Sequence, residues 1–121
     1  MPDSSLYVRL GGSEGIRQII EDVVAAHLDN PVVGERFRKV EDIANLKAKA
    51  WEFFCAGAGG PETYTGKDMI SAHKGMNITE AEYAAVTDDI LLSLSKNRID
   101  DATANDVKAI LDSLRNQVVG V

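Results

Sequence analysis

The sequence predicts an all-α fold. Apolar residues recur three and four positions apart along four long stretches, which is the spacing of one face of a helix. No stretch alternates apolar and polar residues over the length of a strand. Glycine and proline lie between these stretches, where they would interrupt a helix. We therefore expect four long helices joined by short connectors.

The first long helix follows a short apolar piece, 6–10, which ends at the paired glycines 11–12. Glycine loses more backbone entropy in a helix than any other residue, so we expect a turn there. Ser13 is predicted to cap the helix by accepting a backbone N–H bond. The helix should run to about Leu28 and stop before Pro31, because a residue that precedes proline avoids the helical conformation. Its apolar face comprises Ile16, Ile19, Ile20, Val23, Val24 and His27.

The second long helix should follow an apolar turn at 32–37 and begin near 41–42, where two acidic residues suit a helix N-terminus. It must end by the glycines of 57–60. Lys49 borders the apolar stripe of this helix rather than lying opposite it. The stripe comprises Ile43, Leu46, Ala50, Phe53 and Phe54.

A short helix is predicted within 67–74. Met69 and His73 are four residues apart, so they share one of its faces. Gly75 follows as a plausible C-terminal cap. This piece is too short to be explained by packing alone, which draws attention to its histidine.

Two further long helices complete the chain. Residues 79–82 have the sequence of a capping box, which opens the third helix. A polar turn at 97–101 follows, and Asp100 or Asp101 can cap the fourth helix. The apolar positions of the third helix are Tyr83, Val86, Ile90, Leu91 and Leu94, and those of the fourth are Val107, Ile110, Leu111, Leu114 and Val118.

Length and composition predict one globular domain spanning 1–121. A chain of 121 residues can bury enough surface for a single core. A hydrophobic content of 45% with 26% charged residues is ordinary for a folded protein and unlike a disordered one.

Charge and cysteine content exclude several classes of partner. The formal net charge of -6 disfavours nucleic acid, which requires clustered basic residues. No apolar run reaches the length of a membrane span, and the N-terminus has no run of signal-peptide length, so we expect a cytoplasmic protein. The acidic surface favours a soluble monomer. A single cysteine, Cys55, excludes an internal disulfide and a cysteine-rich zinc site.

His73 is the strongest candidate for chemistry, because a neutral imidazole is a good ligand for iron, zinc or copper. The alternative is an ordinary surface or core histidine. His27 ends an apolar stripe and is expected to be a helix-end histidine. A nucleophilic pair of Cys55 and His73 is formally available, but a thiol at an apolar helix end is usually inert.

The remaining residues cannot assemble a closed zinc site, which needs about four ligands. One imidazole in an all-helical chain with many apolar residues meets the requirement for holding a flat apolar macrocycle by one axial bond. Haem is held by such a histidine in several folds. Composition alone does not establish that haem is bound.

Four sequence motifs are similar to those of the truncated haemoglobins, group I. They are LYVRLGG at 6–12, FCAGAGGP at 54–61, YTGKDM at 64–69 and AH at 72–73. Each motif is weak by itself, but the combination is specific, and the resemblance covers about 6–119.

The resemblance implies a two-over-two helical sandwich around haem b, with His73 as the proximal iron ligand. It also implies which residues line the haem: Phe37 at the haem edge, Leu46, Lys49, Ala50, Phe53 and Phe54 on the distal helix, and Met69, Ile78, Tyr83, Val86 and Ile90 on the pocket wall.

The chain departs from the family at the positions that stabilise dioxygen. The family usually carries Phe-Tyr where this chain has Val23 and Val24, and valine cannot donate a hydrogen bond. The family often has glutamine where this chain has Ala50. A hydrogen bond contributes about 1 kcal/mol, or more when the acceptor carries charge. Without these two donors, the retention of dioxygen should weaken by an order of magnitude or more.

Lys49 is the remaining polar residue on that side. In some relatives the residue at this position binds the iron as an internal sixth ligand. We expect Lys49 either to ligate the iron, to donate to a bound ligand, or to reach a haem propionate or water. His27 is an outside alternative as sixth ligand. No histidine follows His73, so the covalent haem linkage of some relatives should be absent.

Three functions follow from these expectations. The first is a haem protein that binds or carries dioxygen, nitric oxide or carbon monoxide, with nitric oxide dioxygenation as a family activity that would need a reductase. The second is a redox, electron-transfer or ligand-sensing protein with iron held by His73 and Lys49. The third is a haem-free helical interaction module with a decayed pocket.

Overall fold

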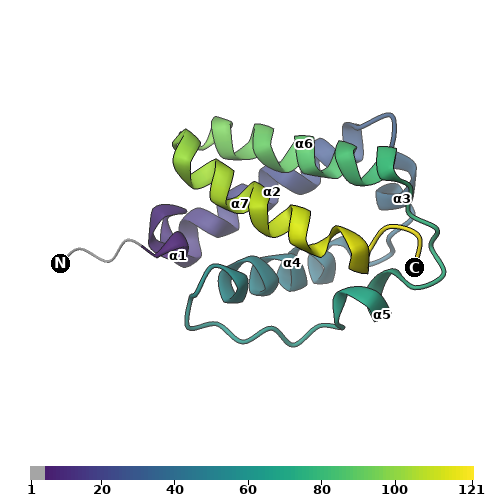
Figure 1. The fold of residues 1–121 in the computed structure, drawn as a ribbon, viewed down its shortest axis with the longest axis horizontal. Helices are drawn as coiled ribbons and strands as arrows, with labels where there is room; N and C mark the ends of the chain where they lie inside the picture. Colours follow the sequence, from purple (N-terminus) through teal and green to yellow (C-terminus); the bar gives the residue numbers. More distant parts are fainter. Residues whose placement is uncertain (1–4) are drawn as a thin grey trace.

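The computed structural model describes residues 5–121, which form helices and no β-strand (Figure 1). The all-α prediction is confirmed. The elements are α1 (Leu6–Arg9), α2 (Gly12–Asp29), α3 (Gly34–Arg38), α4 (Ile43–Gly57), α5 (Met69–His73), α6 (Glu80–Lys96), α7 (Asp101–Leu114) and the 3-10 helix η1 (Arg115–Gln117). The four long helices expected from the apolar spacing correspond to α2, α4, α6 and α7.

The start of α2 differs from the prediction. Ser13 was expected to cap this helix, but it lies inside α2, and the N-cap residue is Gly11 with no side-chain hydrogen bond. Gly11 has φ +97°, a left-handed conformation that a residue with a side chain adopts at a cost. A Cβ on Gly15 would lie 2.5 Å from the Leu10 carbonyl oxygen, so the α1–α2 corner closes tightly around two glycines. Close approach at this corner therefore sets the boundary of the helix.

The other helix starts follow the sequence more closely. Asp42 caps α4 by accepting a bond from the Asn45 N–H at 3.0 Å. The predicted capping box at the start of α6 is confirmed, with Thr79 and Glu82 each bonding the other's backbone N–H. Asp100 precedes α7 but makes no side-chain capping bond.

Helix α2 is the centre of the core. It packs against α4 on one side and α6 on the other, and α6 also packs against α7. Apolar side chains from these helices form one buried cluster, which removes them from water and supplies the main stabilising term. The cluster comprises Leu10, Ile16, Ile19, Ile20, Val23, Val24, Cys55, Ala58, Ile90, Leu94 and Val107.

Helix α5 lies at the edge of the molecule, beyond the long connection 58–68 (Figure 1). Its chief packing partner is η1 rather than any long helix. The C-terminal residues hold the chain just after α5: the Gly75 N–H donates to the Val121 carbonyl at 3.1 Å, and the Gly120 N–H donates to Ile78 at 3.0 Å. An isolated parallel bridge pairs Ile78 with Val119. Residues 69–78, called here the His73 segment, are thus attached to the end of the chain.

None of the helices within residues 5–121 combines the length and the apolar character needed to cross a membrane.

Candidate functional site

The His73 imidazole is oriented by its own helix. It lies at the end of α5, and its Nδ1 is 2.8 Å from the Met69 carbonyl oxygen. A carbonyl can only accept, so Nδ1 carries the proton in this bond. In the neutral ring the lone pair is then on Nε2, which is the form that binds a metal. The side chain is half-buried, as a ligand reached from one side would be.

Apolar side chains predicted to contact a haem are incompletely covered by protein. Four predicted residues of α4 are only partly buried, as are Met69, Ile78 and Val86. The α4 residues are Leu46, Ala50, Phe53 and Phe54. Ile70 and Met76 of the His73 segment are exposed. A small domain gains stability by covering such side chains, so this apolar surface fits an apolar group that completes the core.

Three residues predicted to contact the haem have other roles as well. The Tyr83 hydroxyl donates to the Leu111 carbonyl at 2.5 Å, which joins α6 to α7. Ile90 is buried in the core cluster with α2. Phe53 makes an edge-on contact with the Tyr64 ring, with centroids 5.2 Å apart. This contact packs the connection 58–68 against α4.

An apolar groove lies between α1, α4 and α7. Phe53 and Phe54 line it from α4, and Val107 and Leu111 line it from α7. The described lining includes no residue of α5. Phe53 and Phe54 therefore belong both to this groove and to the set of predicted haem contacts.

The side chains of α2 and α4 that are predicted to face a bound gas include few hydrogen-bond donors. Val23 and Val24 are both buried in the core cluster, and Ala50 packs against it. None of these three side chains can donate a hydrogen bond. Lys49 is the polar group that the sequence places beside them.

The Lys49 amine bonds to the connection 58–68 in this structure. Its Nζ donates to Thr65 Oγ1 at 2.5 Å and lies 3.8 Å from a carboxylate oxygen of Glu52. Glu52 in turn accepts from both the hydroxyl and the backbone N–H of Thr65, and these bonds lower the pKa of its carboxyl. Iron ligation by Lys49 stays a prediction, and it requires the amine to leave these partners.

His27 belongs to a buried polar cluster that was not foreseen. Its Nδ1 lies 2.7 Å from Asp89 Oδ2, and the Asn30 amide donates to both Asp89 oxygens at 3.1 and 3.0 Å. Burial lowers the pKa of His27, and the bond to Asp89 opposes that shift. The His27 ring stacks on Phe37 with centroids 4.6 Å apart. This cluster therefore supports a residue predicted to lie at the haem edge.

Asp89 was missed because an acidic residue on a helix is usually solvated. The available signal was its position one residue before the apolar Ile90 and three after Val86, on the inward side of the helix. That position is informative only when a partner such as His27 faces it.

Cys55 is enclosed in the core. Burial raises the pKa of its thiol to about 11, and its charged neighbours are Glu62 and Arg17. A protonated, enclosed thiol is a poor nucleophile, which disfavours the formal Cys55–His73 pair.

The donor set fits haem better than a bare metal ion. His73 offers one nitrogen, and within residues 5–121 no three His, Cys, Asp or Glu side chains gather as metal ligands. One axial nitrogen together with apolar side chains that protein leaves partly uncovered is the combination that haem requires. Haem would supply the iron on which a gas molecule binds.

Comparison with known proteins agrees with this geometry. Residues 5–119 match the family of bacterial-like globins. A group 1 truncated hemoglobin of Tetrahymena pyriformis is 26% identical over 116 residues, covering 96% of this chain and 95% of that protein. One of Mycolicibacterium paratuberculosis is 27% identical, covering 95% of this chain and 84% of that protein.

Two solved structures have the same fold. The Fe(III) form of the Tetrahymena pyriformis truncated hemoglobin superposes with a TM-score of 0.93 at 24% identity, covering 98% of this chain and all of that one. A 2/2 hemoglobin of a Synechococcus species with covalently attached heme has a TM-score of 0.88 at 24% identity, again covering 98% of this chain and all of that one. At this level of identity both show the shared fold.

Proposed function

Because this chain belongs to the bacterial-like globin family, we propose that it binds haem and small diatomic gases, with the iron held by His73. The observation that carries the proposal is the hydrogen bond from His73 Nδ1 to the Met69 carbonyl, which leaves Nε2 as the free ligand atom. The haem is proposed to be haem b held without a covalent bond, since no histidine follows His73 to form a linkage to it.

The proposed haem contacts come from four helices, α3, α4, α5 and α6, and from the loop that contains Ile78. Apolar side chains of α4 and α6 would contact the haem, exclude water and keep the bound gas in an apolar environment. The proposed residues are Phe37, Leu46, Lys49, Ala50, Phe53, Phe54, Met69, His73, Ile78, Tyr83, Val86 and Ile90.

Gas binding, rather than turnover, is the proposed primary role. Val23, Val24 and Ala50 present no hydrogen-bond donor, so a bound dioxygen would lack the contacts that slow its release. Nitric oxide dioxygenation needs a long-lived dioxygen complex and a reductase. This activity is therefore less supported here than the reversible binding of dioxygen, nitric oxide or carbon monoxide.

Haem uptake tests the proposal directly. The purified chain should develop a Soret band when titrated with hemin, and His73→Gly should bind hemin more weakly. Added imidazole should restore the His73→Gly spectrum, because it can take the place of the missing ring. Lys74→Ala is the matched control, since this neighbour is exposed. A parent protein without a Soret band, or a His73→Gly variant with the parent spectrum, would refute the assignment.

The role of Lys49 decides between two versions of this function. If its amine leaves Thr65 and binds the iron, the ferric protein has nitrogen on both sides and favours electron transfer. If the amine stays at Thr65 and Glu52, the distal side is open for gas. The salt-bridge distance of 3.8 Å to Glu52 makes that ion pair weak enough to exchange.

Ferric absorption spectra separate the two versions. Lys49→Ala should change the spectrum between about pH 6 and 10 if the amine ligates, because ligation needs its neutral form. Lys47→Ala is the control, since this lysine of the same helix bonds to Glu21 instead. Identical spectra for the parent and Lys49→Ala would remove the ligation hypothesis. Fast autoxidation with fast electron exchange would then be the remaining support for a redox role.

We further propose that 1–121 acts as a single-domain monomer. One cooperative unfolding transition and a monomeric mass by sedimentation are the expected results.

A further inference from the structure

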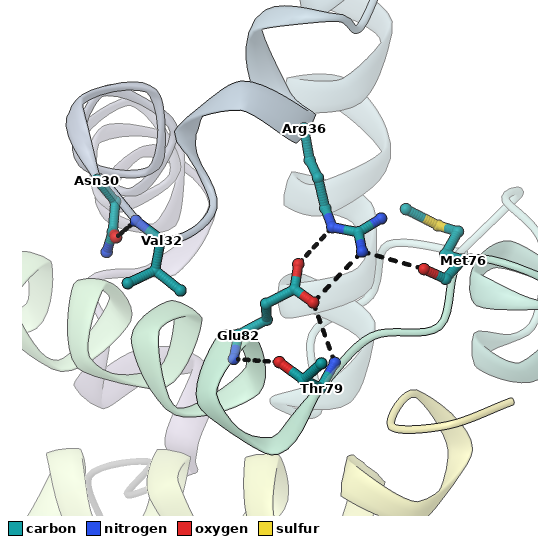
Figure 2. Close-up of polar contacts among 6 residues, drawn as sticks. All are labelled: Asn30, Val32, Arg36, Met76, Thr79 and Glu82. Atoms are coloured by element: carbon teal, nitrogen blue, oxygen red, sulfur yellow. Dashed lines mark hydrogen bonds and ion pairs between the residues drawn. The ribbon is translucent and has the colours of Figure 1, made fainter.

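Arg36 joins two segments that lie far from it in the sequence (Figure 2). It belongs to α3, and its guanidinium donates through Nε and Nη2 to the Glu82 carboxylate of α6. The same Nη2 donates to the Met76 carbonyl oxygen at 3.0 Å. One side chain thus links α3, the start of α6 and the His73 segment. We call Arg36, Glu82 and the Met76 carbonyl the Arg36 clamp.

The Glu82 carboxylate is also held by a bond within its own helix start. Glu82 is the third residue of α6 and accepts the Thr79 N–H at 3.1 Å as part of the capping box (Figure 2). Its side chain is 13% exposed, and that of Arg36 is 37% exposed. The hydrogen bond from Arg36 is the main cause of the lowered pKa of Glu82. A planar guanidinium can bond a carboxylate and a carbonyl together, which a lysine ammonium does with less directional control.

The Met76 side of the clamp lies close to the proposed iron ligand. The Met76 N–H donates to the His73 carbonyl at 3.1 Å, so the two residues share one turn of backbone. On the other side the His73 segment is bonded to the C-terminal residues and packs chiefly on η1. Without Arg36, the Met76 carbonyl would lose a charged donor and the segment would be attached mainly through the end of the chain.

The clamp is also next in sequence to a residue predicted to contact the haem. Phe37, the residue after Arg36, stacks on His27 and is predicted to lie at the haem edge. Helix α3 therefore carries one residue proposed to touch the haem and one that bonds the segment bearing its ligand. The position of the His73 segment therefore depends on the same helix that places Phe37.

We propose that Arg36 is a positioning residue, which holds the His73 segment against α3 and α6 and so sets where the His73 ring meets the iron. The inference rests on the proposed function of His73. Groups that orient a metal ligand without touching the metal commonly change affinity by about 10- to 100-fold when removed.

The test compares Arg36→Met with Arg38→Met. Arg38 is on the same helix, but it donates to the Leu28 carbonyl at 2.8 Å, so its loss spares the His73 segment. Arg36→Met should release hemin to an acceptor globin about tenfold faster than the parent and shift the ferrous iron–histidine stretching band. Arg38→Met should behave as the parent in both measurements. Equal hemin release by the parent and Arg36→Met would overturn the proposal.

Hydrogen exchange in the haem-free protein gives an independent readout. Arg36→Met should speed amide exchange in 73–78 while leaving α2 and α6 unchanged, whereas a general loss of stability would speed exchange throughout. Glu82→Gln keeps the size of the side chain and should produce a smaller change at the same residues. Unchanged exchange in 73–78, or a uniform increase across the chain, would refute the clamp. A parent protein that takes up no hemin would instead refute the proposed function, because the exchange result does not depend on haem.

Discussion

The buried cluster of His27, Asn30 and Asp89 supports a quantitative prediction. Asp89 is 8% exposed and accepts one bond from His27 and two from the Asn30 amide, at distances between 2.7 and 3.1 Å. In Asp89→Asn one acceptor oxygen becomes a donor NH2 group of nearly the same size. At least one of the converging donors must then face another donor.

The expected cost follows from the bonds lost. A hydrogen bond to a charged group contributes about 1.5–3 kcal/mol, and one such bond is lost when an oxygen is replaced. For a domain of this size each kcal/mol lowers the melting temperature by about 4 °C. Asp89→Asn should therefore lower the melting temperature by roughly 6–12 °C.

Thermal unfolding followed by circular dichroism at the helix band measures this shift. Asp88→Asn is the matched control, because Asp88 is the adjacent acid and is exposed. The double variant Asn30→Asp/Asp89→Asn exchanges donor and acceptor, so it should recover much of the loss. The cluster would not contribute as argued if Asp89→Asn had the same melting temperature as Asp88→Asn. The same conclusion would follow if the double variant melted no higher than Asp89→Asn alone.

Three further predictions concern ligand binding, pH and the thiol. Val24→Tyr places a hydroxyl donor where the family usually has one and should slow dioxygen dissociation about fivefold by stopped flow, and an unchanged rate would show that the hydroxyl does not reach the ligand. Because burial lowers the pKa of His27, the unfolded chain binds more protons than the folded one below about pH 6.5, so stability to urea should fall from pH 7.5 to 5.5, and a His27→Gln variant with the same pH slope would contradict this. Because burial raises the pKa of Cys55 to about 11, a disulfide reagent should react with the native protein only as it unfolds, and a rapid stoichiometric reaction in buffer would show the thiol to be accessible.

Much of the fold was predictable from local signals. The stripe from Ile16 to Val24, the stop before Pro31 and the capping box at Thr79 each depend on residues within a few positions of one another. Local rules describe these features because the interacting groups are covalently close. The start of α2 was the exception: the close approach of Gly15 to Leu10 decided it, and the capping preference of Ser13 did not.

The candidate site likewise has one part that local sequence signals predicted and another part that they did not. His73 could be selected from the sequence because it is one of two histidines, and its bond to Met69 spans four residues of one helix. The prediction that Lys49 reaches the iron could not be settled, since its amine has a choice of partners and here bonds to Thr65. Asp89 and the Arg36 clamp were not anticipated at all.

What the sequence determined by itself was the helical fold and its boundaries to within a few residues, and it was enough to single out the histidine proposed to hold an iron. Tertiary structure decided which polar groups meet: His27 pairs with Asp89 across 62 positions, and Arg36 pairs with Glu82 across 46. The reason is that helix formation and capping act over one or two turns, whereas a pairing between helices depends on how the whole core packs.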